Sequence, residues 1–299
     1  MKKIKLGIIG MSEGNGHPYS WSAIFNGYDK KIMESCPFPA IPCYLSKQRF
    51  PEDLIKEGKV THIWTQDKKI SEHIAAASHI DNIVDCYLDF MGEVDAVLLA
   101  RDDYENHYEM SIPFLKAGLP IYIDKPIAIN ERAAEKIFSM QNYEGQIFTG
   151  SALGYAREFQ LTSEDLKIIG AFERIEACTE KSWAKYGVHI IDPVLRLIGD
   201  QKGIKSIKRS GTKDKKTVTV EWNSGLQTIF STFGDAFCPV SIRLCGSNGF
   251  RKLIFEDTFF AFRAALMHFV DIVLKRCPSQ SKQFALNVVR IIEQGGGND

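Results

Sequence analysis

The feature that most constrains the fold is an alternation of short apolar runs with helical patterns between residue 3 and about residue 150. The apolar runs are continuous, which is typical of strands covered by helices on both faces. We expect strands at Ile4–Ile9, Thr61–Thr65, Asn82–Asp85, Ala96–Ala100, Ile121–Ile123 and Ile147–Ala152, and helices at Ser20–Phe25, Ser71–Ala77, Glu105–Ala117 and Asn130–Met140. This order predicts a doubly wound parallel sheet.

Beyond about residue 155 the pattern changes to that of a second sheet. We expect neighbouring antiparallel strands, with a hairpin turn at 223–225, from the runs Phe172–Cys178, Ile204–Lys208, Thr217–Trp222, Thr228–Phe233 and Ser241–Cys245. Two amphipathic helices follow, Phe259–Lys275 and Lys282–Gln294. The 299-residue chain is therefore an α/β protein, with a nucleotide-binding domain over residues 1–127 and an α+β domain, whose sheet is open and mostly antiparallel, over residues 128–299.

The stretch Glu34–Leu54 contains four prolines and does not fit the alternation. We expect neither a helix nor a regular strand to run through it. A long loop of this kind is either functional or a surface cover over the first helix.

Composition excludes two classes of partner. The 37 basic and 37 acidic residues balance, whereas nucleic acids and anionic membranes attract proteins with a surplus of Lys and Arg. No apolar run reaches the ~20 residues of a membrane helix. The basic start, Met1-Lys2-Lys3, leads into a short apolar run without a small-residue cleavage site, so we expect a buried strand rather than an export signal.

The seven cysteines show no Cys-x-x-Cys pair and are odd in number. Their spacing matches neither a disulfide framework nor a zinc site, and we expect no metal. Reduced core thiols in a cytoplasmic protein are the expected state.

A glycine-rich segment, residues 7–16, follows the first strand and precedes a helix. Glycines at this place let the main chain approach a pyrophosphate, and a helix N-terminus favours its negative charge. The spacing departs from G-x-G-x-x-G, so a glycine-rich turn without a ligand is the alternative. If a dinucleotide binds, we expect Gly10, Met11, Ser12 and Gly14 to contact it.

The end of the second strand leaves the choice between NAD and NADP open. An acid at this place usually accepts hydrogen bonds from the ribose hydroxyls of NAD. Here Thr65 and Gln66 occupy it, and the first acid, Asp67, comes later. No arginine follows to hold a 2′-phosphate, although Lys68 and Lys69 are near.

The segment Ala117-Gly118-Leu119-Pro120-Ile121-Tyr122-Ile123-Asp124-Lys125-Pro126 resembles the Glu-Lys-Pro motif of the glucose–fructose oxidoreductase/inositol dehydrogenase (Gfo/Idh/MocA) family. Asp124 stands where glutamate is commoner. Arg101-Asp102-Asp103 leading to Asn106-His107 resembles the family's Pro-Asn-x-x-His pattern, and residues 186–192 resemble its Gly-x-His-x-x-Asp. These motifs occur in the family's order along nearly the whole chain.

The resemblance implies a Rossmann domain and NAD(P)-dependent oxidation or reduction of a sugar, nucleotide sugar or polyol. It implies that Ala100, Arg101, His107, Asp124 and Lys125 lie at the cofactor. It also implies that the second sheet forms subunit contacts, in a homodimer or homotetramer.

Hydride transfer from an alcohol needs a group that takes the hydroxyl proton. We expect Lys125 to anchor the substrate and His189 to act as acid or base, since its unperturbed pKa lies nearest neutrality. The structural alternatives are a solvated loop lysine and a packed histidine. Arg157, Glu158 and Trp183 are candidates for lining a substrate pocket.

Lys185 stands where the family commonly has an aspartate, four residues before the histidine. It is either a proton-transfer group, a sign that the usual catalysis is lost, or a lysine that points to solvent. The leading hypothesis is a sugar oxidoreductase. A non-catalytic nicotinamide-binding regulatory protein, and a hydrolase or lyase that uses bound NAD in a redox cycle, are the alternatives.

Overall fold

The computed structural model describes residues 3–212 and 215–297, which divide into two compact units. The first unit consists of the chain up to Ile127 together with Glu135–Thr149 and Ala265–Lys282. The second consists of Ala128–Ala134, Gly150–Ala264 and the chain from Gln283 onward.

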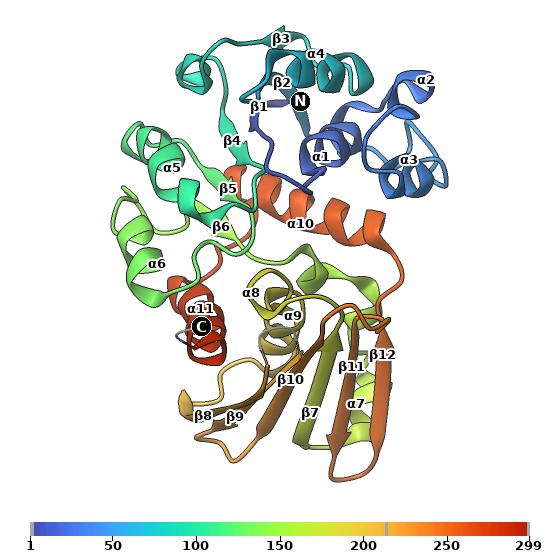
Figure 1. Ribbon diagram of the computed structural model, residues 1–299, viewed down its shortest axis with the longest axis vertical. Helices are drawn as coiled ribbons and strands as arrows, with labels where there is room; N and C mark the ends of the chain where they lie inside the picture. Colours follow the sequence, from blue (N-terminus) through green and yellow to red (C-terminus); the bar gives the residue numbers. More distant parts are fainter. Residues whose placement is uncertain (1–2, 213–214, 298–299) are drawn as a thin grey trace. The chain divides into compact units, whose positions relative to one another are not determined.

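A six-stranded parallel sheet forms the centre of the first unit, in the order β3-β2-β1-β4-β5-β6 (Figure 1). Its strands are β1 (Ile4–Ile9), β2 (Gly58–Trp64), β3 (Asn82–Ile83), β4 (Ala96–Leu99), β5 (Ile121–Ile123) and β6 (Ile147–Thr149). Each expected strand is present, and the differences lie at strand ends. The predicted doubly wound sheet is confirmed. Met1 and Lys2 of the basic start lie outside the described residues.

Side chains pack on both faces of this sheet, which explains why its central strands are mostly apolar and buried. Tyr122 of β5 stacks at 4.8 Å on Trp21 of α1 (His17–Asn26) and lies 5.7 Å from Phe269 of α10 (Thr258–Val273). On the opposite face a Cβ at Gly7 would come within 2.6 Å of the Phe90 ring. The remaining helices of this part of the chain are α2 (Lys30–Met33), α3 (Ala40–Leu45), α4 (Lys68–Ala77), α5 (His107–Lys116) and α6 (Glu131–Phe138).

The proline-rich stretch contains a helix, contrary to expectation. Pro42 lies in the first turn of α3, where a missing N–H breaks no helical hydrogen bond. Ile41 and Leu45 of this helix are buried, and a Cβ at Gly16 would come within 2.6 Å of the Ile41 side chain. The stretch therefore packs on the start of α1. The prediction failed because it counted prolines without regard to their position in a turn.

The second unit contains a mixed six-stranded sheet in the order β12-β11-β7-β10-β9-β8. Its strands are β7 (Phe172–Thr179), β8 (Ile204–Gly211), β9 (Lys215–Trp222), β10 (Gln227–Phe233), β11 (Ser241–Gly246) and β12 (Phe250–Ile254). The mostly antiparallel sheet and the hairpin turn at 223–225 are confirmed. The exception to antiparallel pairing is β7 with β10, which pair in parallel. Helices follow β7 and supply the crossover that parallel strands require.

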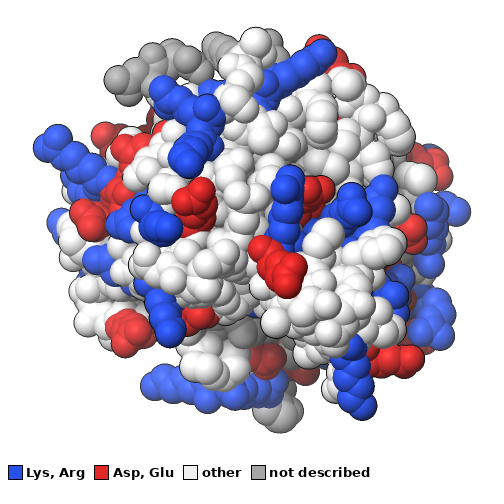
Figure 2. All heavy atoms as spheres, turned by 90° about the horizontal axis from the view of Figure 1, so that it is seen from below, with Lys and Arg blue, Asp and Glu red and all other residues white. Residues whose placement is uncertain are grey.

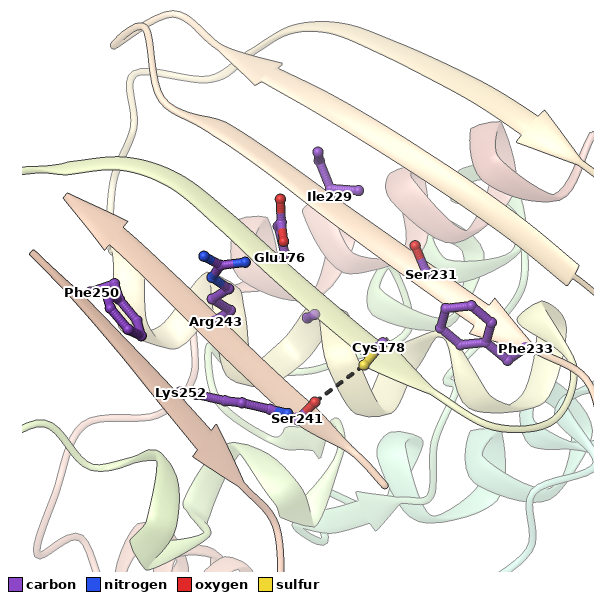
Figure 3. A pocket seen from close by; sticks show the side chains of 10 residues that line it. Glu176, Cys178, Ile229, Ser231, Phe233, Ser241, Arg243, Phe250 and Lys252 are labelled. Carbon is purple, nitrogen blue, oxygen red and sulfur yellow. Dashed lines mark hydrogen bonds between the residues drawn. The ribbon is translucent and has the colours of Figure 1, made fainter. Parts of the chain in front are cut away.

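One face of this sheet is covered and the other is hollowed. Helix α9 (Val188–Ile198) packs on β7 and β11, and α11 (Lys282–Gly296) adds Val288 and Ile291 to the same core. The remaining helices of this unit are α7 (Ser163–Ile169) and α8 (Trp183–Tyr186). On the other face Glu176, Cys178, Ser231 and Arg243 are among the residues that line a hollow of about 430 Å³ (Figure 3).

The distribution of surface charge agrees with the balanced composition, whereas the positions of the cysteines differ from expectation. Basic and acidic side chains are interspersed on the face drawn in Figure 2, with no patch of one sign covering it. The seven cysteines are free, but Cys36 alone is buried, so the expected core thiols are largely at half-exposed positions. In the described residues no helix has the length and apolar character needed to cross a membrane.

Candidate functional site

The glycine loop between β1 and α1 brings the main chain close to the helix. A Cβ at Gly10 would lie 2.3 Å from Pro18, so the loop can approach α1 only without a side chain there. Gly14 has φ +77°, in the region that favours glycine, and a Cβ built on it meets no atom within 4 Å. Main chain at Gly14 therefore faces open space.

Two side chains tie this loop to the ends of neighbouring strands. Gln66 accepts a hydrogen bond from the Met11 N–H at 2.9 Å and donates one to the Met11 carbonyl at 2.6 Å. Ser12 donates to Asp102 at 2.6 Å and accepts from the Asp102 N–H at 3.0 Å. The loop is thus held at the carboxyl ends of β2 and β4, where doubly wound sheets bind ligands.

The N–H groups in the first turn of α1 already donate hydrogen bonds within the protein. The His17 N–H donates to Asn15 Oδ1 at 2.8 Å, Pro18 has no N–H, and the Tyr19 N–H donates to the Gly16 carbonyl at 3.1 Å. The N–H groups of His17 and Tyr19 are thus already engaged, whereas the main chain at Gly14 faces open space.

Asp124 and Lys125 lie at the end of β5 and are nearly buried. Asp124 is 1% exposed, accepts from Asn15 Nδ2 at 2.9 Å, and lies 2.6 Å from His17 Nδ1. Burial alone would raise its pKa, but the positive charges of His17 and Lys125 outweigh burial and hold the pKa well below its usual range. This carboxylate stabilises the fold at pH values above its unfolded-state pKa, and the contribution is lost as the pH falls toward the lowered value.

Lys125 is 9% exposed, and its ammonium lies 3.5 Å from the Asp102 carboxylate. It is therefore not the solvated loop lysine of the alternative interpretation. Ser12, Asp102 and Lys125 form one chain of contacts from the glycine loop to the end of β5. Such a cation can hold a substrate oxygen at the strand ends where ligands bind.

Two of the other predicted cofactor-binding residues, Thr65 and Arg101, are buried and hydrogen-bonded beside the loop. Thr65 is buried, and its hydroxyl donates to the Asp67 carbonyl. Arg101 is also buried, and its guanidinium is held by Asp103 and by Gln66 Oε1 at 3.1 Å. Polar groups at the ends of β2 and β4 are thus fixed to one another beside the loop.

Ala100 and His107 are fully buried. The His107 ring nitrogens face the carbonyls of Arg101, at 2.8 Å, and of Ile127, at 3.1 Å. This histidine joins the chain after β4 to the chain after Lys125. Any part that it has in binding therefore comes from holding these two segments together.

His189 lies in the first turn of α9 in the second unit. Its Nδ1 lies 2.8 Å from Ser151 Oγ, and its ring meets the Tyr186 ring edge-on with centroids 5.4 Å apart. Ser151 also accepts from the Leu153 N–H at 3.2 Å. The Ser151 hydroxyl therefore helps to orient this imidazole.

One helical turn beyond His189, α9 carries an ion pair between Asp192 and Arg196. Asp192, which is fully buried, accepts from Arg196 Nε at 2.6 Å and from the Ser151 N–H at 3.2 Å. Burial raises the Asp192 pKa, while Arg196 and the Ser151 N–H act in the opposite direction. Asp192, the aspartate of the Gly-x-His-x-x-Asp pattern, thus holds the main chain at Ser151 in place.

Lys185 of α8 is exposed, as in the interpretation that it points to solvent. The predicted approach of Lys185 to Lys125 joins residues of different units and stays a prediction. Trp183, a candidate pocket residue, is 2% exposed, and its Nε1 donates to the Ile292 carbonyl at 2.9 Å, so it belongs to the core. Arg157 and Glu158 both hold Asp257, at 2.6 and 2.9 Å.

Sequence reasoning missed several partners of the predicted site residues, namely Asn15, His17, Asp102 and Ser151. Asn15 and Asp102 lie within motifs that were recognised for other reasons, and His17 directly follows the glycine-rich segment, so their polar character was the available signal. Ser151 lies two residues after the end of β6, in a connecting segment of the kind that often carries functional residues. In the described residues no group of three or more His, Cys, Asp or Glu side chains could hold a metal ion.

Comparison with known proteins supports the first unit most directly. Residues 4–152 match the model of the family GFO_IDH_MocA, described as an oxidoreductase family with an NAD-binding Rossmann fold. No curated protein has a significantly similar sequence.

Solved structures resemble the whole chain. Apo scyllo-inositol dehydrogenase from Lactobacillus casei is 13% identical with a TM-score of 0.72, over 97% of this chain and 94% of that one. Myo-inositol 2-dehydrogenase from Lactobacillus plantarum is 14% identical with a TM-score of 0.70, over 99% and 98%. GenD2 from gentamicin A biosynthesis, in complex with NAD, is 11% identical with a TM-score of 0.72, over 100% and 95%. At these identities the likeness shows the fold.

Proposed function

This chain belongs to the Gfo/Idh/MocA oxidoreductase family, and we propose that it is an NAD(P)-dependent oxidoreductase that interconverts a secondary alcohol and a ketone of a sugar, nucleotide sugar or polyol. The observation that carries the proposal is Lys125, a nearly buried ammonium held 3.5 Å from Asp102 at the end of β5. The solved relatives named as inositol dehydrogenases support the substrate class.

The proposed roles follow from the chemistry of each group. A nicotinamide, when bound, supplies or accepts the hydride. Gly10, Met11, Ser12 and Gly14 would hold the pyrophosphate, and Lys125 would donate a hydrogen bond to the reacting oxygen. His189 would take or return the hydroxyl proton, with Ser151 as its positioning residue. The free cysteines support a cytoplasmic setting as part of the proposal.

A fluorescence titration with NADH and NADPH, followed by a turnover screen over sugars, polyols and nucleotide sugars, tests the proposal. We expect cofactor binding and oxidation of at least one such alcohol. Binding without any turnover would instead support the non-catalytic regulatory protein. Absence of nicotinamide binding at millimolar cofactor would refute both.

We predict weak discrimination between NAD and NADP. The position of the usual acid is taken by Thr65, whose hydroxyl is already engaged by Asp67 and by Ser71 at 2.8 Å. Neither a repelling carboxylate nor a dedicated phosphate-binding arginine is present at that place. The Kd ratio, measured by titration, should stay below about 1000-fold, which corresponds to about 4 kcal/mol. A larger ratio would show that another residue selects the cofactor.

We also propose that the open sheet of the second unit pairs two copies of the chain. Phe250 and Phe233 are 60% and 40% exposed beside the hollow of Figure 3, and Arg243 lies over the Phe250 ring at 5.6 Å. Apolar surface beside charged groups is typical of interfaces. Light scattering at micromolar concentration should report a dimer or tetramer. The Phe250→Glu variant should show a lower molar mass than the wild type. Leu88→Glu, at an exposed apolar residue of the first unit, is the control. A monomeric wild type would contradict the proposal.

A further inference from the structure

A polar pocket in the second unit lies where β7 and β10, which run in parallel, both end. It has a volume of about 610 Å³, within the ~300–1,000 Å³ of small-molecule sites. The described residues that line it include three lysines, Lys181, Lys185 and Lys215, and one acid, Asp235. The lining is completed by Ser182, Tyr186, Gly234 and Ala236.

Lys181 is held in place by its surroundings. Its ammonium donates to the Tyr186 hydroxyl at 2.7 Å and lies 4.6 Å from the centroid of the Tyr186 ring. Its backbone has φ +63°, which is unfavourable for a lysine, and is bridged to Gly234. A residue in a sparsely populated backbone region persists because its neighbours fix it. Lys181 is exposed, but its ammonium is tied to Tyr186 and its backbone to Gly234.

The other two lysines leave positive charge in the pocket uncompensated. Within the described ranges, neither Lys185 nor Lys215 makes an ion pair, and Asp235 makes none with them. Among the described residues that line the pocket, three ammonium groups thus stand against one carboxylate, and Glu180 is a further acid whose charge acts on Lys181. Hydroxyl groups of Ser182 and Tyr186 supply further donors. This donor set suits the oxygens of a phosphate or a carboxylate.

Tyr186 connects this pocket to the proposed acid–base residue. Its hydroxyl receives the Lys181 hydrogen bond, and its ring contacts the His189 ring. We propose that the lysine pocket binds an anionic group of the substrate, so that the sugar carries a phosphate or a carboxylate away from its reacting carbon. This inference rests on the proposed function, and it gives Lys185 a binding role in place of the acid usual at its position.

The test uses the full-length protein and the probes sodium phosphate and sodium acetate. Amide NMR shifts of residues 181–186 and 234–236 are followed as each anion is added, with sodium chloride at equal ionic strength as reference. We expect saturable shifts with millimolar Kd. Lys185→Gln and Lys215→Gln should each weaken binding roughly fivefold, and the double variant more. Tighter binding of phosphate would indicate a phosphorylated or nucleotide sugar, and tighter binding of acetate a uronate.

Lys208→Gln is the matched control, because Lys208 is an exposed lysine of β8 whose carboxylate partner is Glu221. It should leave anion binding unchanged. Shifts that do not saturate, or that persist equally in the Lys185 and Lys215 variants, would overturn the proposal. An NADH titration on the same samples separates the two hypotheses. If the protein binds the anions but not NADH, the proposed oxidoreductase function is contradicted. If it binds NADH but not the anions, the proposed anion pocket is contradicted.

Discussion

Replacement of Lys125 by alanine is expected to lower kcat by roughly a hundred- to ten-thousandfold, with a much smaller change in nicotinamide affinity. The ammonium is nearly buried and lies 3.5 Å from Asp102, so its charge is poorly screened by water. No second lysine is paired with a carboxylate at the end of β5 in the described residues. Steady-state kinetics with the alcohol found in the turnover screen measures the effect.

The alanine variant also leaves the carboxylates of Asp102 and Asp124 without this cation, so folding must be controlled. Lys125→Arg keeps the charge and should retain the thermal stability, yet lose most of the rate because a planar guanidinium cannot replace a compact ammonium. Lys59→Ala removes an exposed lysine, paired with Asp81, and should change neither quantity. A Lys125→Ala enzyme within about threefold of the wild-type kcat would exclude a catalytic role.

The parallel sheet could be predicted from the sequence because its central strands β1, β4, β5 and β6 are short, mostly apolar runs. Ile4–Ile9 and Ile121–Ile123 have the expected bounds. The prediction failed where position inside a turn decides the outcome. Pro42 is tolerated in the first turn of α3, and no count of prolines contains that information.

Pairing direction in the second sheet was beyond local reasoning. β7 and β10 are separated by two helices and two strands, and their parallel pairing depends on that long connection. The direction of the hairpin between β9 and β10, by contrast, is encoded locally by the turn at 223–225.

The motif residues of the candidate site could be predicted from the sequence, but the residues that contact them could not. The segment around Lys125 and the histidine at 189 stand out in the sequence, but their partners do not. Asp124 meets His17 across 107 residues, and His189 meets Ser151 across 38. Contacts of this separation depend on the completed fold, so sequence spacing gives no sign of them. The lysine pocket shows the same limit, since Lys215 joins Lys181 and Lys185 only through the pairing of β9 with β10.

Removal of the Arg196 guanidinium should be the most damaging single change to the fold of the second unit. Asp192 is fully buried, and Arg196 is its cationic partner at 2.6 Å. Breaking a buried pair leaves an uncompensated charge and typically costs about 3–5 kcal/mol. Arg196 also lies over the Tyr155 and Phe284 rings, at 4.3 and 4.7 Å. Arg196→Met keeps an apolar stem against these rings, so the loss in urea unfolding reports mainly on the charge.

The dependence on pH gives this prediction its sign. Burial raises the folded-state pKa of Asp192 above the unfolded value, so the group favours the folded chain most at acid pH, below the unfolded-state pKa. That contribution is lost as the pH rises through the folded-state pKa. Without Arg196 the folded-state pKa of Asp192 rises further. The folding stability that is lost above this pKa therefore becomes larger. The deficit of Arg196→Met relative to wild type should therefore be largest at neutral pH and shrink as the solution is acidified toward pH 4.

A second substitution separates the buried charge from a simple packing defect. Asp192→Asn removes the negative charge but keeps an acceptor for the Ser151 N–H. Combined with Arg196→Met it should recover much of the lost stability at neutral pH, and it should flatten the pH dependence, because no buried carboxylate remains to be neutralised. Additive losses in the double variant, unchanged between neutral and acid pH, would show that Arg196 stabilises the unit through its ring contacts rather than through Asp192.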